Sequence, residues 1–294
     1  MDNLRGIVLM TAAMAGFAME DMLIKRVSAH LPVGQILLVL GLGGACVFAL
    51  MALRQGAAFW SARALHPAVL LRNGAEMVGT IGFVTALALV PLSTASAILQ
   101  ASPLAVTLGA ALFLGEKVGW RRWTAIGVGF LGVLIVIRPG MDTFQANSLW
   151  AVLGVIGLSA RDLGTRGVPR DVTTIQLSAW GFAAVGLLGA GMLAVTGGAA
   201  APDAPQAAHL AAALAFGVAS YWAMTTATRV GDVSSIMPFR YTRLVFALAL
   251  GALVFGERPD LPTLLGAGLV IASGLYTLAR ERRLRALSLQ GRTG

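Results

Sequence analysis

A few charged side chains lie deep inside otherwise apolar stretches of this sequence. By helical rise, Arg240 lies about 10 Å from the nearer end of its apolar stretch, and Glu76 lies roughly 12 Å inside another. Asp162 has a comparable depth, so either acid could be the counter-ion of Arg240. Charges placed this deep tend to face cavities. Arg240 and these acids could therefore form a structural ion pair or a site at which a charged solute or a coupling ion binds. For Arg243, the sequence identifies no counter-ion.

Two acid–base pairs have the spacing of neighbours on one helix face. Asp21 and Lys25 are four residues apart, in the favourable order with the acid first, and Asp162 and Arg166 repeat the arrangement. Intrahelical ion pairs would lower the cost of embedding these charges in an apolar medium. The other interpretation is that the two pairs belong to gates at opposite ends of a pathway, and the sequence leaves both open.

Hydroxyl and amide groups follow residues 93–113 and 234–255, which are otherwise apolar. The first stretch holds Gln100 and Pro103, and the second holds Pro238 and Tyr241. A proline frees backbone carbonyls and often bends a helix, so these two stretches are the best candidates for a solute path. Tyr221 and Trp222, flanked by hydroxyl residues, suit either a pocket for a partly apolar solute or ordinary packing.

These residues must be positioned by membrane-spanning helices. The chain of 294 residues is 57% hydrophobic and only 12% charged, and its mean hydropathy is +0.80. A soluble globule of this composition could not cover its own surface. A helix that crosses a bilayer needs about 20 mainly apolar residues. Ten such windows occur, and we expect an all-α integral membrane protein with spans at 4–26, 33–53, 67–90, 93–113, 120–137, 148–167, 173–195, 206–228, 234–255 and 261–279.

The second half of the chain repeats the first. An offset of 141 residues, without gaps, aligns Ser93 with Ser234, Gly115 with Gly256 and Glu116 with Glu257, and the same offset aligns Asp21 with Asp162. We therefore expect two units, residues 1–140 and 141–294, with five spans each. Because five is odd, the second unit must enter the membrane upside down relative to the first. Inverted repeats of this kind are typical of secondary transporters, whose solute site lies between the copies.

The basic residues predict an orientation. With a cytoplasmic N-terminus, sixteen of the 22 Lys and Arg residues fall on the cytoplasmic side and four on the other, while two lie inside a span. This bias predicts that both termini lie in the cytoplasm. We expect a multi-pass protein of a bacterial-type inner membrane. The net charge of +9 needs no nucleic-acid partner, because the basic tail after residue 279 can contact anionic lipid.

The sequence gives little support for a metalloenzyme, a protease, an ATP-driven pump or a channel. Cys46 is the single cysteine, and the three histidines have no metal-ligand spacing, so we expect no disulfide, metal or cofactor. An HExxH motif and a Walker motif are absent from the sequence. Asp21 and Asp162 are the one symmetric acid pair for an intramembrane aspartyl protease, but inversion would separate them. A channel fits less well than a closed cavity, since the charges are mixed and scattered.

The end of each repeat resembles a known family. The segments LGEKVGWRRWTAIGVGFLGVLIVI and FGERPDLPTLLGAGLVIASGLYTL are similar to the end of the EamA-type repeat of the drug/metabolite transporter superfamily: an acid after a glycine, a short hydrophilic turn and a glycine-rich last helix. The resemblance covers essentially the whole chain. It implies a transporter, not an enzyme, with a central cavity lined mainly by spans three, four, eight and nine together with one and six. Glycine-rich spans five and ten would be scaffold or a homodimer contact.

That resemblance also implies a set of contact residues. Carrying the cavity over places in it Glu76, Gln100, Tyr221, Trp222, Arg240 and Tyr241. A zwitterionic amino acid fits these side chains, because Arg240 could bind its carboxylate, Glu76 its ammonium group and the aromatic residues its side chain. The resemblance thus favours an exporter of amino acids, including aromatic or other apolar ones, that works by alternating access. An uptake permease, or a carrier of drugs, sugars or nucleotide precursors, is the alternative within the superfamily.

Overall fold

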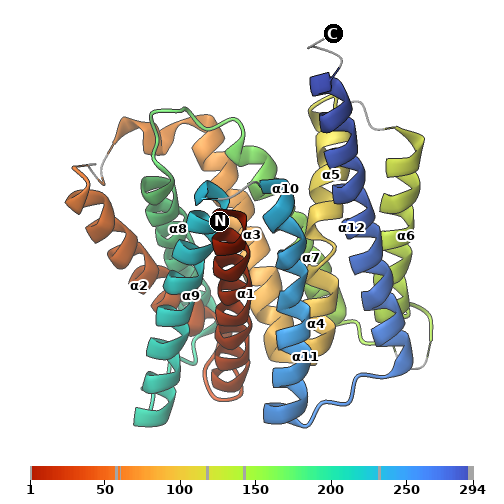
Figure 1. The fold of residues 1–294 in the computed structure, drawn as a ribbon. Helices are drawn as coiled ribbons and strands as arrows, with labels where there is room; N and C mark the ends of the chain where they lie inside the picture. The colour runs from red at the N-terminus through yellow and green to blue at the C-terminus, as the bar shows by residue number, and fades with distance from the viewer. Residues whose placement is uncertain are drawn as a thin grey trace.

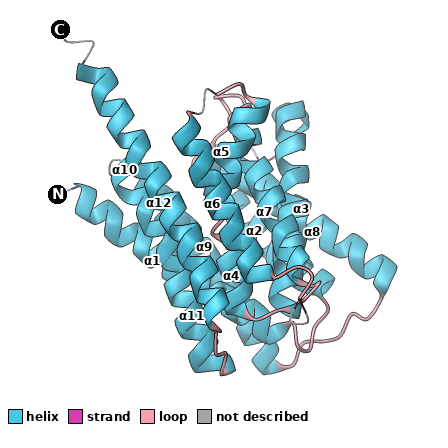
Figure 2. Cartoon of the chain, turned by 90° about the vertical axis from the view of Figure 1, so that its right-hand side faces the viewer, coloured by secondary structure: helices cyan, strands magenta, loops and turns pink. Residues whose placement is uncertain are grey.

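A computed structural model describes residues 2–56, 59, 61–116, 119–141, 144–230 and 233–290, without the side chains of 2, 229, 233, 234 and 281–290. Lys117 of the first motif, Asp142 near the expected boundary between the repeats and the end of the basic tail lie outside these residues. The described part is helical, without β-strands (Figure 2). Its helices are α1 (Asp2–Val27), α2 (Val33–Arg54), η1 (Ala62–Leu65), α3 (Pro67–Leu89), α4 (Leu92–Leu99), α5 (Ser102–Phe113), α6 (Trp120–Ile137), α7 (Ser148–Thr165), α8 (Thr174–Thr196), α9 (Ala204–Val230), α10 (Val233–Ile236), η2 (Met237–Tyr241), α11 (Thr242–Phe255) and α12 (Leu261–Gln290).

Helices occupy all ten expected windows, and eight of the segments are long and apolar enough to cross a membrane. The chain is therefore a multi-pass membrane protein. The two helices outside this group of eight are α3 and α7. Polar and charged residues, Glu76 and Asp162 among them, lower their mean hydropathy. These two helices pack closely on each other, and Glu76 of α3 is mostly covered by that packing, with its side chain 15% exposed.

The window at 93–113 is a broken helix. Helix α4 ends at Leu99, and α5 begins at Ser102 with Pro103 in its first turn. Pro103 has no backbone N–H to donate to the carbonyl of Leu99. The hydroxyl of Ser102 donates to that carbonyl instead, at 2.7 Å. The window at 234–255 is interrupted in the same region, where the 3-10 segment η2 carries Pro238 between α10 and α11. The prolines therefore produce the irregularities that the sequence predicts.

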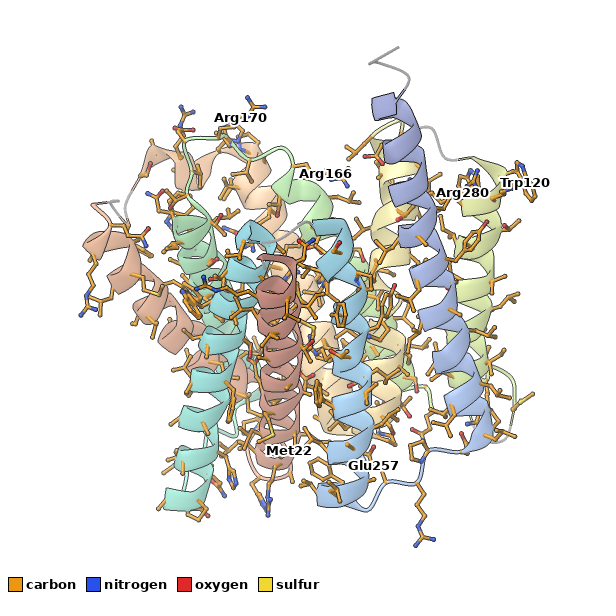
Figure 3. The ribbon with its side chains drawn as sticks, in the orientation of Figure 1. Met22, Trp120, Arg166, Arg170, Glu257 and Arg280 are labelled. Atoms are coloured by element: carbon orange, nitrogen blue, oxygen red, sulfur yellow. The ribbon has the colours of Figure 1, made fainter. Side chains whose placement is uncertain are left out.

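The packing of the helices follows the internal repeat. The closest pairs are α1 with α9, α3 with α7, α2 with α8, and α6 with α12. The counterpart of each span lies five spans away along the chain. Replacing α1 and α9 by their counterparts gives α7 and α3, and each of the other two pairs is replaced by itself. In Figure 1, α1 descends from the end of the bundle that also holds the last turns of α12, whereas α7 ascends. We call this end, which holds Arg166 and Arg170, the upper end, and the end that holds Met22 and Glu257 the lower end (Figure 3).

Glycine permits the closest crossings. In the α3–α7 pair, a methyl group added at Gly157 would lie 2.2 Å from the backbone nitrogen of Gly79 and 2.9 Å from the carbonyl oxygen of Ala75. In the equivalent α1–α9 pair, a methyl group at Gly16, which aligns with Gly157, would meet the hydroxyl of Ser220 at 2.1 Å. Small residues at such crossings let helix backbones approach in a membrane. The glycines thus fix the distance between the two halves of the chain.

This crossing makes a prediction about stability. Gly157→Ala should force α3 and α7 apart and destabilise the protein by about 1–3 kcal/mol, the usual cost of overpacking. Gly127→Ala is the matched control, because a methyl group there meets nothing within 4 Å. Thermal unfolding of the two variants in detergent measures the difference. Equal melting temperatures would show that the helices do not meet closely at Gly157.

Candidate functional site

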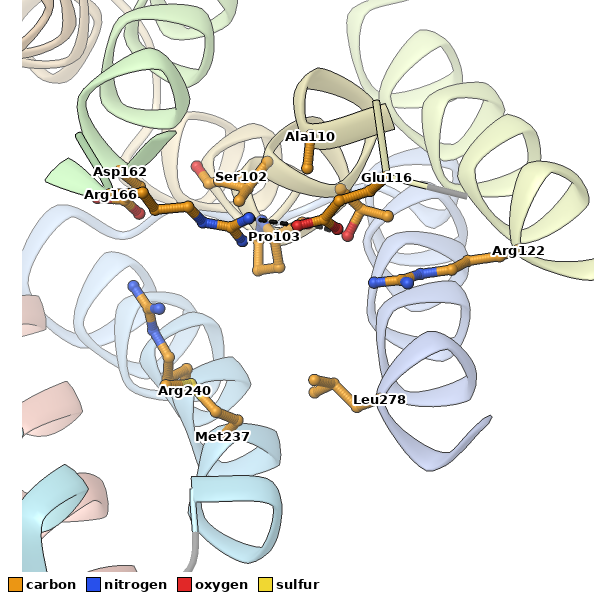
Figure 4. A pocket seen from close by; sticks show the side chains of 12 residues that line it. Ser102, Pro103, Ala110, Glu116, Arg122, Asp162, Arg166, Met237, Arg240 and Leu278 are labelled. Carbon is orange, nitrogen blue, oxygen red and sulfur yellow. Dashed lines mark hydrogen bonds and ion pairs between the residues drawn. The ribbon is translucent and has the colours of Figure 1, made fainter. Parts of the chain in front are cut away.

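A cavity of about 490 Å³, shown from close by in Figure 4, has Arg166 of the upper end in its lining (Figure 3). Helix α5 forms one wall and η2 faces it, while α6, α7 and α12 each contribute side chains. The lining consists of Ser102, Pro103, Val106, Thr107, Ala110, Glu116, Arg122, Asp162, Arg166, Met237, Arg240 and Leu278. Glu116 and Arg166 are about half exposed, so the cavity reaches the protein surface at the upper end.

Arg240 is the cation in this cavity that could receive a solute. It projects from η2 into the space below Asp162 and Arg166 (Figure 4). Within the described residues, its guanidinium forms no hydrogen bond or ion pair. A planar guanidinium binds carboxylate or phosphate oxygens with two parallel hydrogen bonds. Arg240, one of the predicted solute-binding residues, is therefore placed where a carboxylate of the solute could reach it.

Asp162 is one of the two acids in the lining of the cavity. It accepts a hydrogen bond from Arg161 at 2.8 Å and still lines the cavity. Its expected intrahelical partner, Arg166, bonds instead to Glu116 of the other repeat. Of the two interpretations left open for Asp162 and Arg166, this structure does not form the intrahelical ion pair, because a carboxylate on a neighbouring segment binds the guanidinium instead.

Glu76 is occupied by two cations. Arg72, one turn earlier on α3, lies 2.7 Å from one carboxylate oxygen, and Arg161 of α7 lies 3.0 Å from the other. The side chain of Glu76 is only 15% exposed and is absent from the cavity lining. Its geometry is that of an ion pair that joins α3 to α7, which leaves no oxygen directed at a solute in the described cavity.

In the lower half of α1, Asp21 and Lys25 likewise do not form the intrahelical ion pair that was one of their two interpretations. Asp21 accepts three hydrogen bonds from the Arg243 guanidinium of α11, the shortest at 2.7 Å, and its side chain is 3% exposed. Arg243 also stacks over Phe17 and Phe83. Lys25 instead donates to the carbonyl oxygens of Leu87 and Val90, at 3.2 and 2.6 Å. Asp21 is thus the counter-ion of Arg243 that the sequence did not identify.

The other predicted contact residues do not line the described cavity. Gln100 and Tyr241 are 7% and 5% exposed, and each has a buried polar atom without a partner. The Tyr241 ring lies against Gly274 of α12. The hydroxyl of Tyr221 is bonded to Ser178 at 2.6 Å. Trp222 is 55% exposed, so it faces out of the bundle. The hydropathy of the sequence does not predict whether the face of α9 that carries Trp222 points into the bundle or out of it.

Sequence reasoning missed several residues of the lining. Glu116 belongs to the repeated motif, which indicates the family but does not identify this residue as part of a site. Its recurrence at Glu257 was the available signal. Arg122, Met237 and Leu278 carried no signal, since each faces the cavity only because of how α6, η2 and α12 are arranged. Counting the two acids Glu116 and Asp162 against Arg122, Arg166 and Arg240 gives the lining a net charge of +1.

One carboxylate outside the spans is strongly perturbed. Hydrogen bonds from Arg138 and then from Thr263 lower the pKa of Asp260 to about 2 from its ordinary 3.8. The bond joins the end of α6 to the start of α12. Because the folded pKa is depressed, this contribution to stability is complete above about pH 4 and is lost as the pH falls towards 2.

Comparison with known proteins points to one family. The sequence profile described as "EamA-like transporter family" matches residues 4–138 and 146–279. A riboflavin transporter of Rhizobium johnstonii is 32% identical over 206 residues, which cover 70% of this chain and 68% of that protein. An S-adenosylmethionine uptake transporter of Rickettsia bellii is 27% identical over 217 residues, 73% of each chain. A pseudopaline exporter of Pseudomonas aeruginosa is 26% identical over 289 residues, 95% of this chain and 97% of that one. A solved crystal structure shares the fold, with a TM-score of 0.64 and 18% identity over 95% of this chain and 98% of that chain.

The Asp21–Arg243 pair gives a second prediction. Asp21→Asn would leave a buried guanidinium without its counter-ion, which costs about 3–5 kcal/mol of unfolding free energy in comparable cases. The control is Asp171→Asn, because the Arg63–Asp171 pair is more than half exposed and such pairs contribute about 0–1 kcal/mol. Thermal unfolding in detergent should show a large loss for the first variant and almost none for the second. Similar melting temperatures for the two variants would contradict the pairing.

Proposed function

The chain belongs to the EamA-like transporter family of the drug/metabolite transporter superfamily, and from this premise we propose that it exports amino acids or closely similar carboxylate-bearing metabolites. The observation that carries the proposal is Arg240, whose guanidinium has no hydrogen bond or ion pair to any described residue and lines a cavity of net positive charge. Such a cavity suits a solute with a carboxylate. The relatives are named for different solutes, so we base the proposed solute class on the chemistry of this chain's own cavity.

A zwitterion would be held at both ends. Arg240 would take the carboxylate and Asp162 the ammonium group, since both line the cavity. Asp162 replaces Glu76 in this role, because Glu76 is saturated by Arg72 and Arg161. The apolar side chain of the solute would contact Val106, Met237 and Leu278. These residues are compatible with aliphatic and aromatic amino acids alike.

The transport cycle we propose is alternating access between two inverted five-span repeats, residues 1–140 and 141–294. Three observations support it. The sequence repeats with an odd number of spans, the helix pairs exchange with one another under the repeat, and α1 and α7 run in opposite directions (Figure 1). Rocking of one repeat against the other would open the solute site to each side in turn.

We place the upper end in the cytoplasm and the protein in a bacterial inner membrane. Arg166, Arg170 and Arg280 lie at the upper end (Figure 3), and the excess of basic residues on this side obeys the positive-inside rule. The cavity is then open to the cytoplasm, as the loading state of an exporter requires. Uptake is the second candidate, favoured by a relative that is named an uptake transporter.

The orientation can be tested by labelling. In a Cys46→Ser background, Arg54→Cys at the end of α2 should react with a membrane-impermeant maleimide only from the cytoplasmic face. His30→Cys, in the exposed turn between α1 and α2, should react only from the outer face. The reverse pattern would overturn the orientation, and labelling of both from one face would overturn the spans themselves.

Arg240 gives the test of the solute class. Proteoliposomes should be assayed with labelled amino acids, riboflavin, S-adenosylmethionine, sugars and organic cations, with and without a pH gradient. We expect amino-acid transport by the wild type and at least a tenfold loss in Arg240→Gln, since a good charge-assisted pair contributes about 1.5–3 kcal/mol. Arg170→Gln, on the surface of the upper end, is the control and should transport normally.

Three results would overturn this proposal. Undiminished transport in Arg240→Gln would remove the residue from the mechanism. Transport of organic cations but not of amino acids would overturn the solute class. Accumulation against a gradient in the inward direction alone would replace export by uptake.

A further inference from the structure

The two glutamates of the repeated motif have the same backbone setting. Gly115 and Gly256 end α5 and α11 with positive φ angles of 67° and 64°. The backbone N–H of the next residue then turns back to the helix: that of Glu116 donates to Ala110 at 3.2 Å, and that of Glu257 donates to Gly251 at 3.0 Å. All of these positions differ by the repeat offset of 141. The chain therefore delivers the two carboxylates to equivalent places at opposite ends of the bundle.

The side chains of the two glutamates nevertheless have different partners. Glu257 crosses to the first repeat and accepts hydrogen bonds from the backbone N–H of Leu92 at 2.6 Å, and from the N–H and hydroxyl of Ser93 at 3.0 and 2.7 Å. A carboxylate on the first N–H groups of a helix is a charge-assisted cap. Glu116 makes no such cap and instead pairs with Arg166 at the mouth of the cavity (Figure 4).

The basic residues that align with each other show the same contrast. Lys25, the counterpart of Arg166, donates to the carbonyls of Leu87 and Val90, at the end of α3. Lys25 and Glu257 thus hold the turn between α3 and α4 from both sides, one on its free carbonyls and the other on its free N–H groups. This places α4 against α11 at the lower end. At the upper end, where the equivalent acid and base bind each other, α5 and η2 face one another across the cavity.

We propose that Glu257 with Lys25 and Glu116 with Arg166 are two reciprocal clamps of the transport cycle, each positioning the helix hairpin that closes its own end. In this structure the lower clamp is engaged and the upper one is released. When the upper end closes, Glu116 moves to the backbone N–H groups of Val233 and Ser234, the counterparts of Leu92 and Ser93, at the start of the helical segment 233–255. Glu257 then leaves α4 and pairs with Lys25. The number of charge-assisted contacts is similar in both states, so neither state traps the carrier.

This inference rests on the alternating access proposed above, but not on the identity of the solute. Its test is therefore a measurement of conformation in the absence of any solute. In the Cys46→Ser background, Val106→Cys reports the upper half, because Val106 lines the cavity. Ala247→Cys is its counterpart in the lower half, at the aligned position, and it is fully buried in this structure. Labelling rates with an impermeant maleimide are measured from the face on which each site lies.

Glu257→Gln should favour the state that is open at the lower end. We expect labelling of Ala247→Cys to rise about fivefold, the shift typical of losing a good helix cap, and labelling of Val106→Cys to fall. Glu116→Gln should act in the opposite direction, with faster labelling of Val106→Cys. The double variant should restore a balance between these extremes. Ser93→Ala, which removes one donor to Glu257, should shift labelling the same way as Glu257→Gln but less.

Asp260→Asn is the control, because this carboxylate lies three residues from Glu257 and bonds to α6 and α12 instead. It should leave both labelling rates unchanged. Parallel changes at the two reporters in Glu257→Gln would indicate general loosening and overturn the reciprocal clamps. Unchanged rates in both glutamate variants and in Ser93→Ala would also overturn them. Undiminished transport in Arg240→Gln, together with opposite labelling shifts in the two glutamate variants, would overturn the role proposed for Arg240 and leave this inference intact, so the two proposals fail separately.

Discussion

Charged groups inside a bilayer must find partners within the protein, because lipid chains offer neither water nor hydrogen bonds. In this protein the partners come mostly from the other repeat. Asp21 of the first repeat holds Arg243 of the second, Glu76 holds Arg161, and Glu257 reaches back to α4. Most of the ion pairs therefore lie between the two halves of the chain. A close-packed apolar core resists continuous deformation. The two repeats can instead move relative to each other in discrete steps, by exchanging one set of polar contacts for another.

Local rules gave the helices but not these contacts. Hydropathy and proline placement predicted ten helical windows and the interruptions near Pro103 and Pro238, because both depend on neighbouring residues. The spacing rule for helix faces offered an ion pair between Asp21 and Lys25 as one of two interpretations, and this pair does not form in the structure. A bidentate guanidinium from α11 satisfies both oxygens of Asp21, and a flexible lysine on the same helix cannot do so. Which side chain competes is decided by tertiary packing.

The candidate site was predictable to a similar extent. Arg240 could be singled out because an isolated arginine in an apolar stretch needs a cavity or an acid, whichever helices surround it. Tyr241 and Trp222 could not be assigned, since their roles depend on helix rotation. Tyr241 turned toward the gap left by Gly274, and Trp222 turned outward. In the sequence, Glu116 stands out only because it aligns with Glu257. Its proposed role follows from the structure, where the two glutamates have different partners.

The repeats have also diverged where solute selectivity would require it. Glu76 and Arg161 form an ion pair in the α3–α7 interface. The aligned positions in the α1–α9 interface are Gly217 and Glu20, so the Glu20 carboxylate lies over a glycine instead of a cation. The two halves can thus form equivalent clamps at their ends while differing at their centre.

Arg240 bears on how solute binding is coupled to closing of the cavity. Arg240 is tolerable without a partner only while water fills the cavity, because an isolated cation in a dry, apolar site is costly. Closing an empty carrier would remove that water, whereas a bound carboxylate would replace it, so the proposed solute would itself lower the cost of closing the upper end.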